Sequence, residues 1–374
     1  MSEKTEEFFL VALPGLEDLV LAEVEEWFPN LEAKAEHGGV TVHAPLNVGL
    51  SLNLALKTPT RILLRVSQFR CRDFPKLFKI ISALDWERWL DSSCELETVV
   101  STRLSRLKIK LRISETCEDA WAEYKKRVGA KSVRGRKATL YVRFLNDECM
   151  LSLDTSGERL HKRGDRRHIG DAPLRETIAA SLIQLVGRSH PGSGQGPIEL
   201  VDPMMGSGTF LLEAETRDQL VEKRGFGFES FRAPGLVQPR LTVERPVFNS
   251  FVGFERDTKA MAAAKENLRG HRGFKFYPDD FFTANPLPED GVRRWLFANP
   301  PYGERIKVKE PLGELYVRLF AAAERVVRPE RACFLLPSKA VKGKFALPRG
   351  WKVLAKRPFL NGGIPVTAFV FGRE

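Results

Sequence analysis

Cysteine and histidine are scarce in this sequence, and neither is arranged in a metal-binding pattern. The five cysteines are dispersed over 374 residues without a C-x-x-C pair, and the six histidines are scattered as well. An odd, dispersed set of cysteines argues against a disulfide framework and against a structural zinc site. We therefore expect no metal in this protein.

Long hydrophobic runs are also missing. No apolar stretch approaches the roughly 20 residues that a membrane span requires. The N-terminus, MSEKTEEFFLVALPGL, places acidic residues before a short apolar run, whereas a secretory signal begins with basic ones. These absences predict a cytoplasmic protein without a membrane partner. With 43% hydrophobic residues the chain can build two or three packed domains, and nothing in it demands more than a monomer.

Basic residues are in excess, and they are unevenly distributed. Lys and Arg number 59 against 48 Asp and Glu, which gives a net charge of +11. They gather in residues 61–72, 103–112, 125–137 and 159–167, and aromatic residues interleave with basic ones in the stretches RVSQFRCRDFPKLFK and YKKRVGAKSVRGRKATLYVRF. A solvated surface over core aromatics is the ordinary explanation for any single residue. Taken together, the clusters favour RNA, which is met through phosphate contacts and base stacking.

The pattern of expected elements changes part-way along the chain. The first half mixes short strands and helices, which is typical of an α+β fold with antiparallel sheets. From about residue 170, strands alternate with helices, which predicts a parallel, doubly wound α/β sheet. We place the boundary within residues 155–170.

A glycine turn follows the first strand of this second half. In LVDPMMGSGTF the strand ends at Asp202, and Gly206 to Thr209 turn the chain into a helix. Such glycines let the backbone approach a ligand closely, and a helix N-terminus favours a negative group. The turn is not a P-loop, and Leu211 stands where a dinucleotide fingerprint has its third glycine. An ordinary strand-to-helix turn explains this piece alone equally well.

Acidic residues end the next two expected strands. Glu255 closes FVGFERD, where a carboxylate can accept hydrogen bonds from ribose hydroxyls. Asp280 in YPDDFF can accept from an adenine amino group while a phenylalanine packs on the base. A helix cap is the simpler explanation for Asp257, and an Asx-type turn is nearly as good for Asp279.

The segment LFANPPYGERI leaves a fourth strand through Asn299, Pro300, Pro301 and Tyr302. The carbonyls of Asn299 and Pro300 form a stiff pair of acceptors, because neither proline has an N–H to compete. They suit a planar exocyclic amine, and the Tyr302 ring offers a face on which a base can stack. Held this way, the amine directs its lone pair toward an electrophilic methyl group.

The ordered motifs VDPMMGSGTFLLEA, FERD, PDDFF and NPPYGER resemble those of class I S-adenosylmethionine-dependent methyltransferases that modify exocyclic amines. With APLRETIAASLI, they are similar to the bacterial THUMP-domain RNA methyltransferases, which include the 23S rRNA guanine-N2 methyltransferases. This resemblance implies a ferredoxin-like region in residues 1–55 and a THUMP RNA-binding region in 56–160. A Rossmann-like class I methyltransferase domain, with a mostly parallel seven-stranded sheet, would occupy residues 161–374.

The resemblance also assigns residues to the cofactor S-adenosylmethionine and to the target base. The base would be held by Asn299, Pro300, Pro301 and Tyr302. The cofactor would be bound by Asp202, Pro203, Met204, Gly206, Ser207, Gly208, Thr209, Glu255, Arg256, Asp280, Phe281, Pro173, Glu176 and Thr177. Met205 departs from the family's frequent cysteine, which we expect to matter little. The excursion in residues 217–249 is similar to a family insertion, and packing on the sheet is its simplest role.

We therefore expect methyl transfer to the exocyclic N2 of a guanine in structured RNA, most simply 23S rRNA. Four alternatives stay open: guanine-N2 transfer to tRNA, adenine-N6 transfer to DNA or RNA, a noncatalytic RNA-binding assembly factor, and a NAD-dependent Rossmann enzyme. Adenine offers the same exocyclic amine, so the motif does not separate the two bases. The incomplete glycine fingerprint counts against NAD, and the intact acidic and asparagine positions count against a relic fold.

Overall fold

The computed structural model describes residues 4–133, 135–163, 174–189, 196–232, 235–302, 311–339, 347 and 349–373. The chain forms two compact units, and neither is one continuous stretch of sequence. Unit 1 consists of residues 1–12, 24–160 and 220–240, and unit 2 consists of residues 13–23, 161–219 and 241–374. The predicted division of the N-terminal half at residue 55 stays a prediction.

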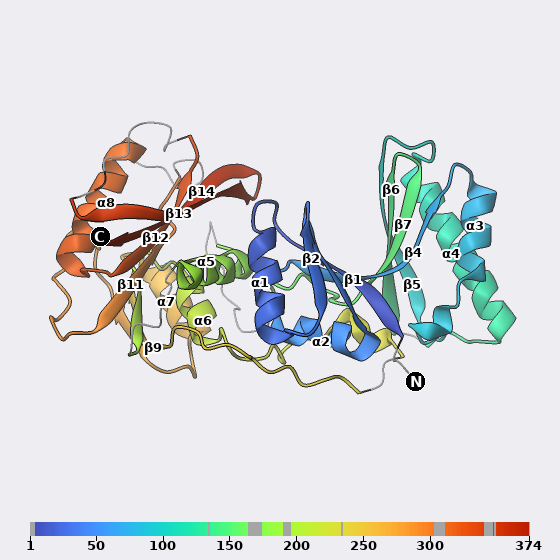
Figure 1. Ribbon diagram of the computed structural model, residues 1–374, viewed down its shortest axis with the longest axis horizontal. Helices are drawn as coiled ribbons and strands as arrows, with labels where there is room; N and C mark the ends of the chain where they lie inside the picture. The colour runs from blue at the N-terminus through green and yellow to red at the C-terminus, as the bar shows by residue number, and fades with distance from the viewer. Residues whose placement is uncertain are drawn as a thin grey trace. The chain divides into compact units, whose positions relative to one another are not determined.

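Unit 1 is built on one seven-stranded sheet in the order β2-β3-β1-β4-β7-β6-β5 (Figure 1). All neighbours are antiparallel except the parallel pair β5 and β6. Its strands are β1 (Thr5–Val11), β2 (Glu32–Glu36), β3 (Gly39–Pro45), β4 (Arg61–Arg70), β5 (Glu95–Arg103), β6 (Lys137–Leu145) and β7 (Glu148–Asp154). The α+β character expected for this half is confirmed.

The helices of unit 1 follow from local sequence signals. Asp73 caps the first turn of α3 by accepting a hydrogen bond from the Lys76 N–H, and Pro75 fits that turn. Helix α4 ends at Gly129, whose φ of +67° suits a residue without a side chain. The helical segments are α2 (Leu46–Ala55), α3 (Phe74–Ala83), the 3₁₀ turn η1 (Trp86–Arg88) and α4 (Lys110–Val128). Helix α1 (Glu17–Trp27) contributes to both units.

Unit 2 contains a second seven-stranded sheet, in the order β10-β9-β8-β11-β12-β14-β13. The first five strands are parallel, and β14 is antiparallel to both of its neighbours. Its strands are β8 (Ile198–Asp202), β9 (Phe248–Phe254), β10 (Phe274–Tyr277), β11 (Arg293–Ala298), β12 (Arg331–Pro337), β13 (Trp351–Asn361) and β14 (Ile364–Arg373). The mostly parallel, doubly wound sheet predicted for this half is confirmed.

Helices cover both faces of this sheet (Figure 1). Successive residues of β11 point to opposite faces, so Trp295 and Phe297 enter one apolar core while Leu296 and Ala298 enter the other. The first core includes side chains of α5, α6, α7 and the start of α1, and the second includes those of α8. The helices are α5 (Glu176–Arg188), α6 (Thr209–Glu215), α7 (Thr258–Asn267) and α8 (Leu312–Val326). None of the described helices combines the length and apolar character of a membrane span.

The strand order places a topological switch point between β8 and β11. The chain leaves β8 for β9 on one side, while β11 pairs with β8 on the other. Open parallel sheets bind ligands at the carboxyl ends of the strands beside such a point. Asp202 ends β8 and Asn299 follows β11, so both predicted site segments lie at this position.

The sequence insertion between α6 and β9 folds partly with unit 1, in residues 220–240. The Val221 N–H donates to the carbonyl of Leu54, and the Ser230 hydroxyl, in the 3₁₀ turn η2 (Gly227–Ser230), donates to the carbonyl of Lys137. A Cβ on Gly227 would lie 2.5 Å from the carbonyl oxygen of Asp154, so the two backbones approach as only glycine allows. Residues 220–240 therefore belong to unit 1 and not, as expected, to the unit that holds the second sheet.

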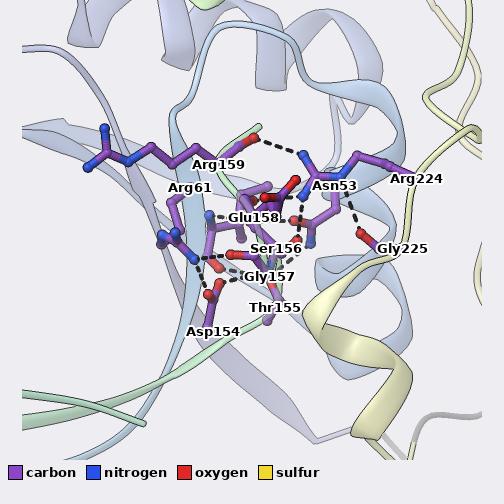
Figure 2. A network of polar contacts seen from close by, with 11 residues as sticks. Asn53, Arg61, Asp154, Thr155, Ser156, Gly157, Glu158, Arg159, Arg224 and Gly225 are labelled. Atoms are coloured by element: carbon purple, nitrogen blue, oxygen red, sulfur yellow. Dashed lines mark hydrogen bonds and ion pairs between the residues drawn. The ribbon is translucent and has the colours of Figure 1, made fainter. Parts of the chain in front are cut away.

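Arg224 also holds this segment, through several hydrogen bonds (Figure 2). Its guanidinium donates to the carbonyls of Ser156, Glu158 and Arg159, at 2.9, 2.7 and 2.9 Å. Just before these carbonyls, the carboxylate of Asp154 at the end of β7 forms an ion pair with Arg61. The insertion is thus held by the loop that follows the last strand of the N-terminal sheet.

Candidate active site

The glycine turn after β8 is tight and open on one side. Gly206 has a φ of +53° and Gly208 a φ of +84°, conformations that side chains disfavour. Among the described residues, a Cβ on Gly206 would meet nothing within 4 Å, whereas one on Gly208 would lie 3.0 Å from Cδ1 of Leu268. The turn therefore presents bare backbone beside Gly206, which is the kind of cradle a ligand needs.

Two neighbouring elements hold this turn in place. The Gly206 N–H donates to Oε2 of Glu255 at 3.0 Å, and the other oxygen of that carboxylate accepts from the Asp257 N–H at 2.9 Å. From α7, the buried side chain of Asn267 donates to the carbonyl of Ser207 at 3.0 Å. Asn267 could not be predicted from the sequence, because an asparagine at the end of a helix carries no local mark of such a contact.

Asp202 is a buried acid at the end of β8, 2% exposed. It accepts a hydrogen bond from the Met204 N–H at 3.0 Å, and no Arg or Lys among the described residues forms an ion pair with it. Burial raises the pKa of Asp202 to about 8, and the neighbouring charge of Glu255 adds to that rise. A buried carboxyl group without a cationic partner fits a ligand that carries an ammonium group.

The remaining residues of the turn are largely buried. Pro203, Ser207 and Thr209 are buried, and Met204 is half-buried against the core on the α8 side. Met205, which stands at the position where cysteine was expected from the resemblance, is 4% exposed. It packs over Gly253, where a Cβ would lie 2.2 Å from the methionine sulfur. The bulkier side chain is accommodated because β9 has a glycine below it.

Asp280, which follows β10, is joined by an ion pair to the segment that follows β9. Arg256, which is exposed, forms an ion pair with Asp280 at 2.9 Å, and Asp280 also accepts from the Phe282 N–H. Phe281 lies in the core, 2% exposed, with its ring edge-on to Phe254 at 5.2 Å. The assignment of Phe281 to the cofactor stays a prediction.

Asn299 and Tyr302 are joined directly. The Tyr302 hydroxyl donates to Oδ1 of Asn299 at 2.6 Å, and its ring packs beside the core on the α5 side. Pro300 is buried, while Asn299, Pro301 and Tyr302 are half-buried. Burial raises the pKa of Tyr302, so its hydroxyl stays protonated at neutral pH. Residues 303–310, which complete the NPPYGER motif, lie outside the described residues.

The helix preceding β8 supplies two of the predicted residues. Glu176 begins α5 and is nearly buried, and Thr177 is fully buried with a hydroxyl that has no hydrogen-bond partner among the residues that the structure describes. A buried hydroxyl without a partner is uncommon and fits a group that accepts or donates only when a ligand is present. Pro173 lies outside the described residues. Across the described residues, no group of three His, Cys, Asp or Glu side chains is arranged to hold a metal ion.

Comparison with known proteins identifies the fold and its lineage. Residues 163–365 match the model of UPF0020, described as the RMKL-like methyltransferase domain, and residues 7–63 match the RlmL ferredoxin-like domain. The chain belongs to the UPF0020 family of methyltransferases. As expected from the resemblance, the family's chemistry is methyl transfer, and its methyl donor is S-adenosylmethionine.

Relatives extend over the whole chain. A Synechocystis protein named "Putative RNA methyltransferase slr0064" is 26% identical, covering 98% of this chain and 96% of the relative. The Ribosomal RNA large subunit methyltransferase K/L of Colwellia psychrerythraea is 29% identical over 85% of this chain. The alignment covers 46% of that relative, so the chain spans about half its length. The crystal structure of SMU.472 complexed with SAH has the same fold, with a TM-score of 0.81 at 24% identity over 99% of each chain.

Proposed function

We propose that this UPF0020 methyltransferase transfers a methyl group from S-adenosylmethionine to the exocyclic N2 of a guanine in structured RNA, most simply 23S rRNA. The observation that carries the proposal is that the two predicted site segments follow neighbouring strands at the switch point of the sheet. Asp202 and the glycine turn end β8, and Asn299 with Tyr302 follows the adjacent β11. A relative named Ribosomal RNA large subunit methyltransferase K/L supports the choice of RNA.

S-adenosylmethionine supplies a methyl group on a sulfonium sulfur, open to in-line attack by an amine. The open backbone beside Gly206 would receive the cofactor, and Asp202 would face its ammonium group. Glu255, already fixed by two backbone N–H groups, keeps lone pairs that can accept from ribose hydroxyls. Asp280, Glu176 and Thr177 would complete the site, with Asp280 accepting from the adenine amino group.

The carbonyls of Asn299 and Pro300 would accept the two hydrogens of the guanine amine. This arrangement points the nitrogen lone pair away from the protein acceptors and toward the methyl group, and the resulting alignment lowers the barrier. The Tyr302 ring would stack on the base, which must leave its helical stack to reach the site. After attack the nitrogen carries an extra proton and is acidic enough to lose it to water or to a nearby acceptor.

Adenine-N6 transfer would use the same two acceptors, so the base is decided by experiment rather than by this geometry. Experiment likewise decides whether the substrate is tRNA or ribosomal RNA. The monomeric state and the cytoplasmic location also stay predictions.

The test uses purified protein, methyl-labelled S-adenosylmethionine and total RNA from a strain that lacks the gene. The RNA is separated by size and digested, and the labelled nucleoside is identified. We expect N2-methylguanosine in the 23S fraction. N6-methyladenosine would keep the site and replace the base, label in the tRNA fraction would replace the substrate, and label in added DNA alone would refute the RNA assignment.

A further inference from the structure

Tyr316 in α8 carries a buried hydroxyl group that has no hydrogen-bond partner. Its side chain is 0% exposed in the core on the α8 side, and no described residue donates to the hydroxyl or accepts from it. Packing alone does not require this group, because Phe320, one turn further along the same buried face, fills its place with a ring that has no hydroxyl. An unpaired hydroxyl in a core lowers stability, so its presence needs another explanation.

The position of Tyr316 in α8 brings it toward the edge of the sheet where the candidate site lies. Since β11 and β12 are parallel neighbours, α8 between them has to return from the carboxyl end of β11 to the amino end of β12. Tyr316 is the fifth of the 15 residues of α8, which places it in the half of the helix nearer the carboxyl edge. Asn299 and Tyr302 leave β11 at that same edge.

Tyr316 also interacts electrostatically with Tyr302. Burial raises the pKa of Tyr316, and the charge that Tyr302 would carry on ionisation raises it further. The two phenols therefore approach each other, although Tyr302 packs beside the core on the α5 side and Tyr316 lies in the core on the α8 side. The Tyr302 hydroxyl donates to Asn299. The unpaired hydroxyl of Tyr316 is thus near the two residues that are assigned to the target base.

Thr177 offers a parallel on the other face of the sheet. Of the residues that the structure describes, Thr177 and Tyr316 are those with a buried hydroxyl that lacks a partner. Thr177 is the second residue of α5. The other end of α5 lies at the amino edge of the sheet, because a Cβ on Gly187 would lie 3.9 Å from the ring of Pro246, which precedes β9. Both unpaired hydroxyls therefore lie toward the carboxyl edge, where open parallel sheets bind their ligands.

We propose that the Tyr316 hydroxyl binds the target base, at the ring nitrogen next to the exocyclic amine that Asn299 and Pro300 hold. A phenol hydroxyl can donate a hydrogen bond, and this nitrogen is an acceptor both at N3 of guanine and at N1 of adenine. The hydroxyl then gains in the complex the partner that it lacks in the free protein. The inference rests on the proposed function, because it takes the target base to be held by the segment from Asn299 to Tyr302.

Tyr316→Phe removes the hydroxyl and keeps the ring, and Gln184→Met is its matched control. Gln184 is 5% exposed, and both polar atoms of its side chain lack a partner among the described residues. It lies one turn before Gly187, at the amino edge of the sheet and away from the site. Each variant relieves a buried polar group of its unpaired state, so thermal unfolding without ligands should show Tm raised by about 2–4 °C in both.

Methyl transfer distinguishes the two variants. The assay uses saturating labelled S-adenosylmethionine and total RNA from a strain that lacks the gene. The value of kcat/KM for RNA should fall about 3- to 10-fold in Tyr316→Phe, since one hydrogen bond to the base is lost, and should be unchanged in Gln184→Met. Calorimetric titration should give the same Kd for the cofactor in all three proteins, because the hydroxyl is assigned to the base.

Four outcomes would overturn the inference. A lower Tm for Tyr316→Phe would mean that the hydroxyl has a partner in the free protein, and an unchanged kcat/KM would mean that it does not bind the substrate. Weaker cofactor binding would assign the hydroxyl to the cofactor instead, and an equal loss in Gln184→Met would trace the loss to core packing. An unaltered protein that methylates no nucleic acid would refute the proposed function and this inference with it, whereas equal activity of the unaltered protein and Tyr316→Phe refutes the inference alone.

Discussion

The Tyr302 hydroxyl donates a 2.6 Å hydrogen bond to the side-chain oxygen of Asn299. A carbonyl oxygen accepts two hydrogen bonds, so one lone pair of Asn299 stays available for a substrate amine. Because burial raises the pKa of Tyr302, the hydroxyl is a constant donor and fixes which way the Asn299 amide faces. From the sequence, Tyr302 is only a stacking surface; in the structure its hydroxyl also positions the neighbouring acceptor.

Replacing Tyr302 with Phe keeps the ring and removes this hydrogen bond. A lost hydrogen bond of this kind is worth about 0.5–1.5 kcal/mol, so we expect kcat to fall about 2- to 10-fold with little change in KM for RNA. Tyr302→Ala should lose more, since it also removes base stacking. Single-turnover rates measure both variants, and a Phe variant as fast as the unaltered enzyme would show that the hydroxyl does not position Asn299.

Asn299→Ala should abolish methyl transfer and leave cofactor binding nearly intact, because its side chain is assigned to the target base. Asp202→Ala and Glu255→Ala should weaken cofactor binding first. Calorimetric titration with the cofactor and a methylation assay, run on the same preparations, separate the two effects. Full turnover by Asn299→Ala would rule out the role assigned to the NPPY segment.

Gly206→Ala and Gly208→Ala form a matched pair. Both residues have positive φ, so each substitution should destabilise the fold by about 1–2 kcal/mol. The new methyl group at 206 meets no described residue within 4 Å, whereas the one at 208 meets Leu268. We expect Gly206→Ala to lose cofactor affinity much more than Gly208→Ala at similar thermal stability. Equal losses of affinity would place the cofactor elsewhere along the turn.

The raised pKa of Asp202 predicts that the stability of the folded protein depends on pH. Its pKa is about 8 in the folded protein and about 3.9 in an unfolded chain. The folded state therefore holds the proton more tightly, and this group lowers stability progressively as pH rises from about 4 to about 8. Asp202→Asn should raise Tm at pH 8 more than at pH 5, by about 2–4 °C for each kcal/mol relieved. Thermal unfolding without cofactor across that range checks it, and parallel pH profiles for the two proteins would contradict it.

The positions of Asp202 and Asn299 could be predicted because each stands at the end of a recognisable strand. Asp202 ends the fully buried β8, and Asn299 comes directly after the apolar residues of β11. The carboxyl ends of parallel strands share one edge of a sheet, so strand order and a polar residue at each end suffice. The roles of these residues are still predictions, and the structure contributes the contacts among them.

Other features could not be predicted, because they depend on long-range contacts without a residue signature. Arg224 bonds to backbone carbonyls, which every residue possesses, so the sequence does not reveal its partners. For the same reason Asn267 and its contact with the Ser207 carbonyl were missed. Phe281 was assigned to the cofactor from its motif, whereas its burial against Phe254 depends on the packing of two strands.

Arg224→Ala tests the attachment of residues 220–240. The variant loses three hydrogen bonds to carbonyls and leaves those acceptors without their donor, so we expect a loss of about 1–3 kcal/mol. Arg224→Lys should recover only part of it, since an ammonium lacks the planar fork. Chemical denaturation gives the loss, and hydrogen exchange should rise within residues 220–240 first. Unchanged exchange there would mean that other contacts hold the segment.

Because the two units are interleaved in the sequence, the order in which the chain is synthesised limits when each unit can finish folding. All seven strands of unit 1 have been made once Asp154 is synthesised, yet the guanidinium of Arg224 arrives only 70 residues later. Conversely, Leu16 and Leu19 are among the first residues made, and they are buried in a core whose strands begin at Ile198. Each unit is completed by a piece of chain that is made with the other, so neither can finish folding while the nascent chain is half-made.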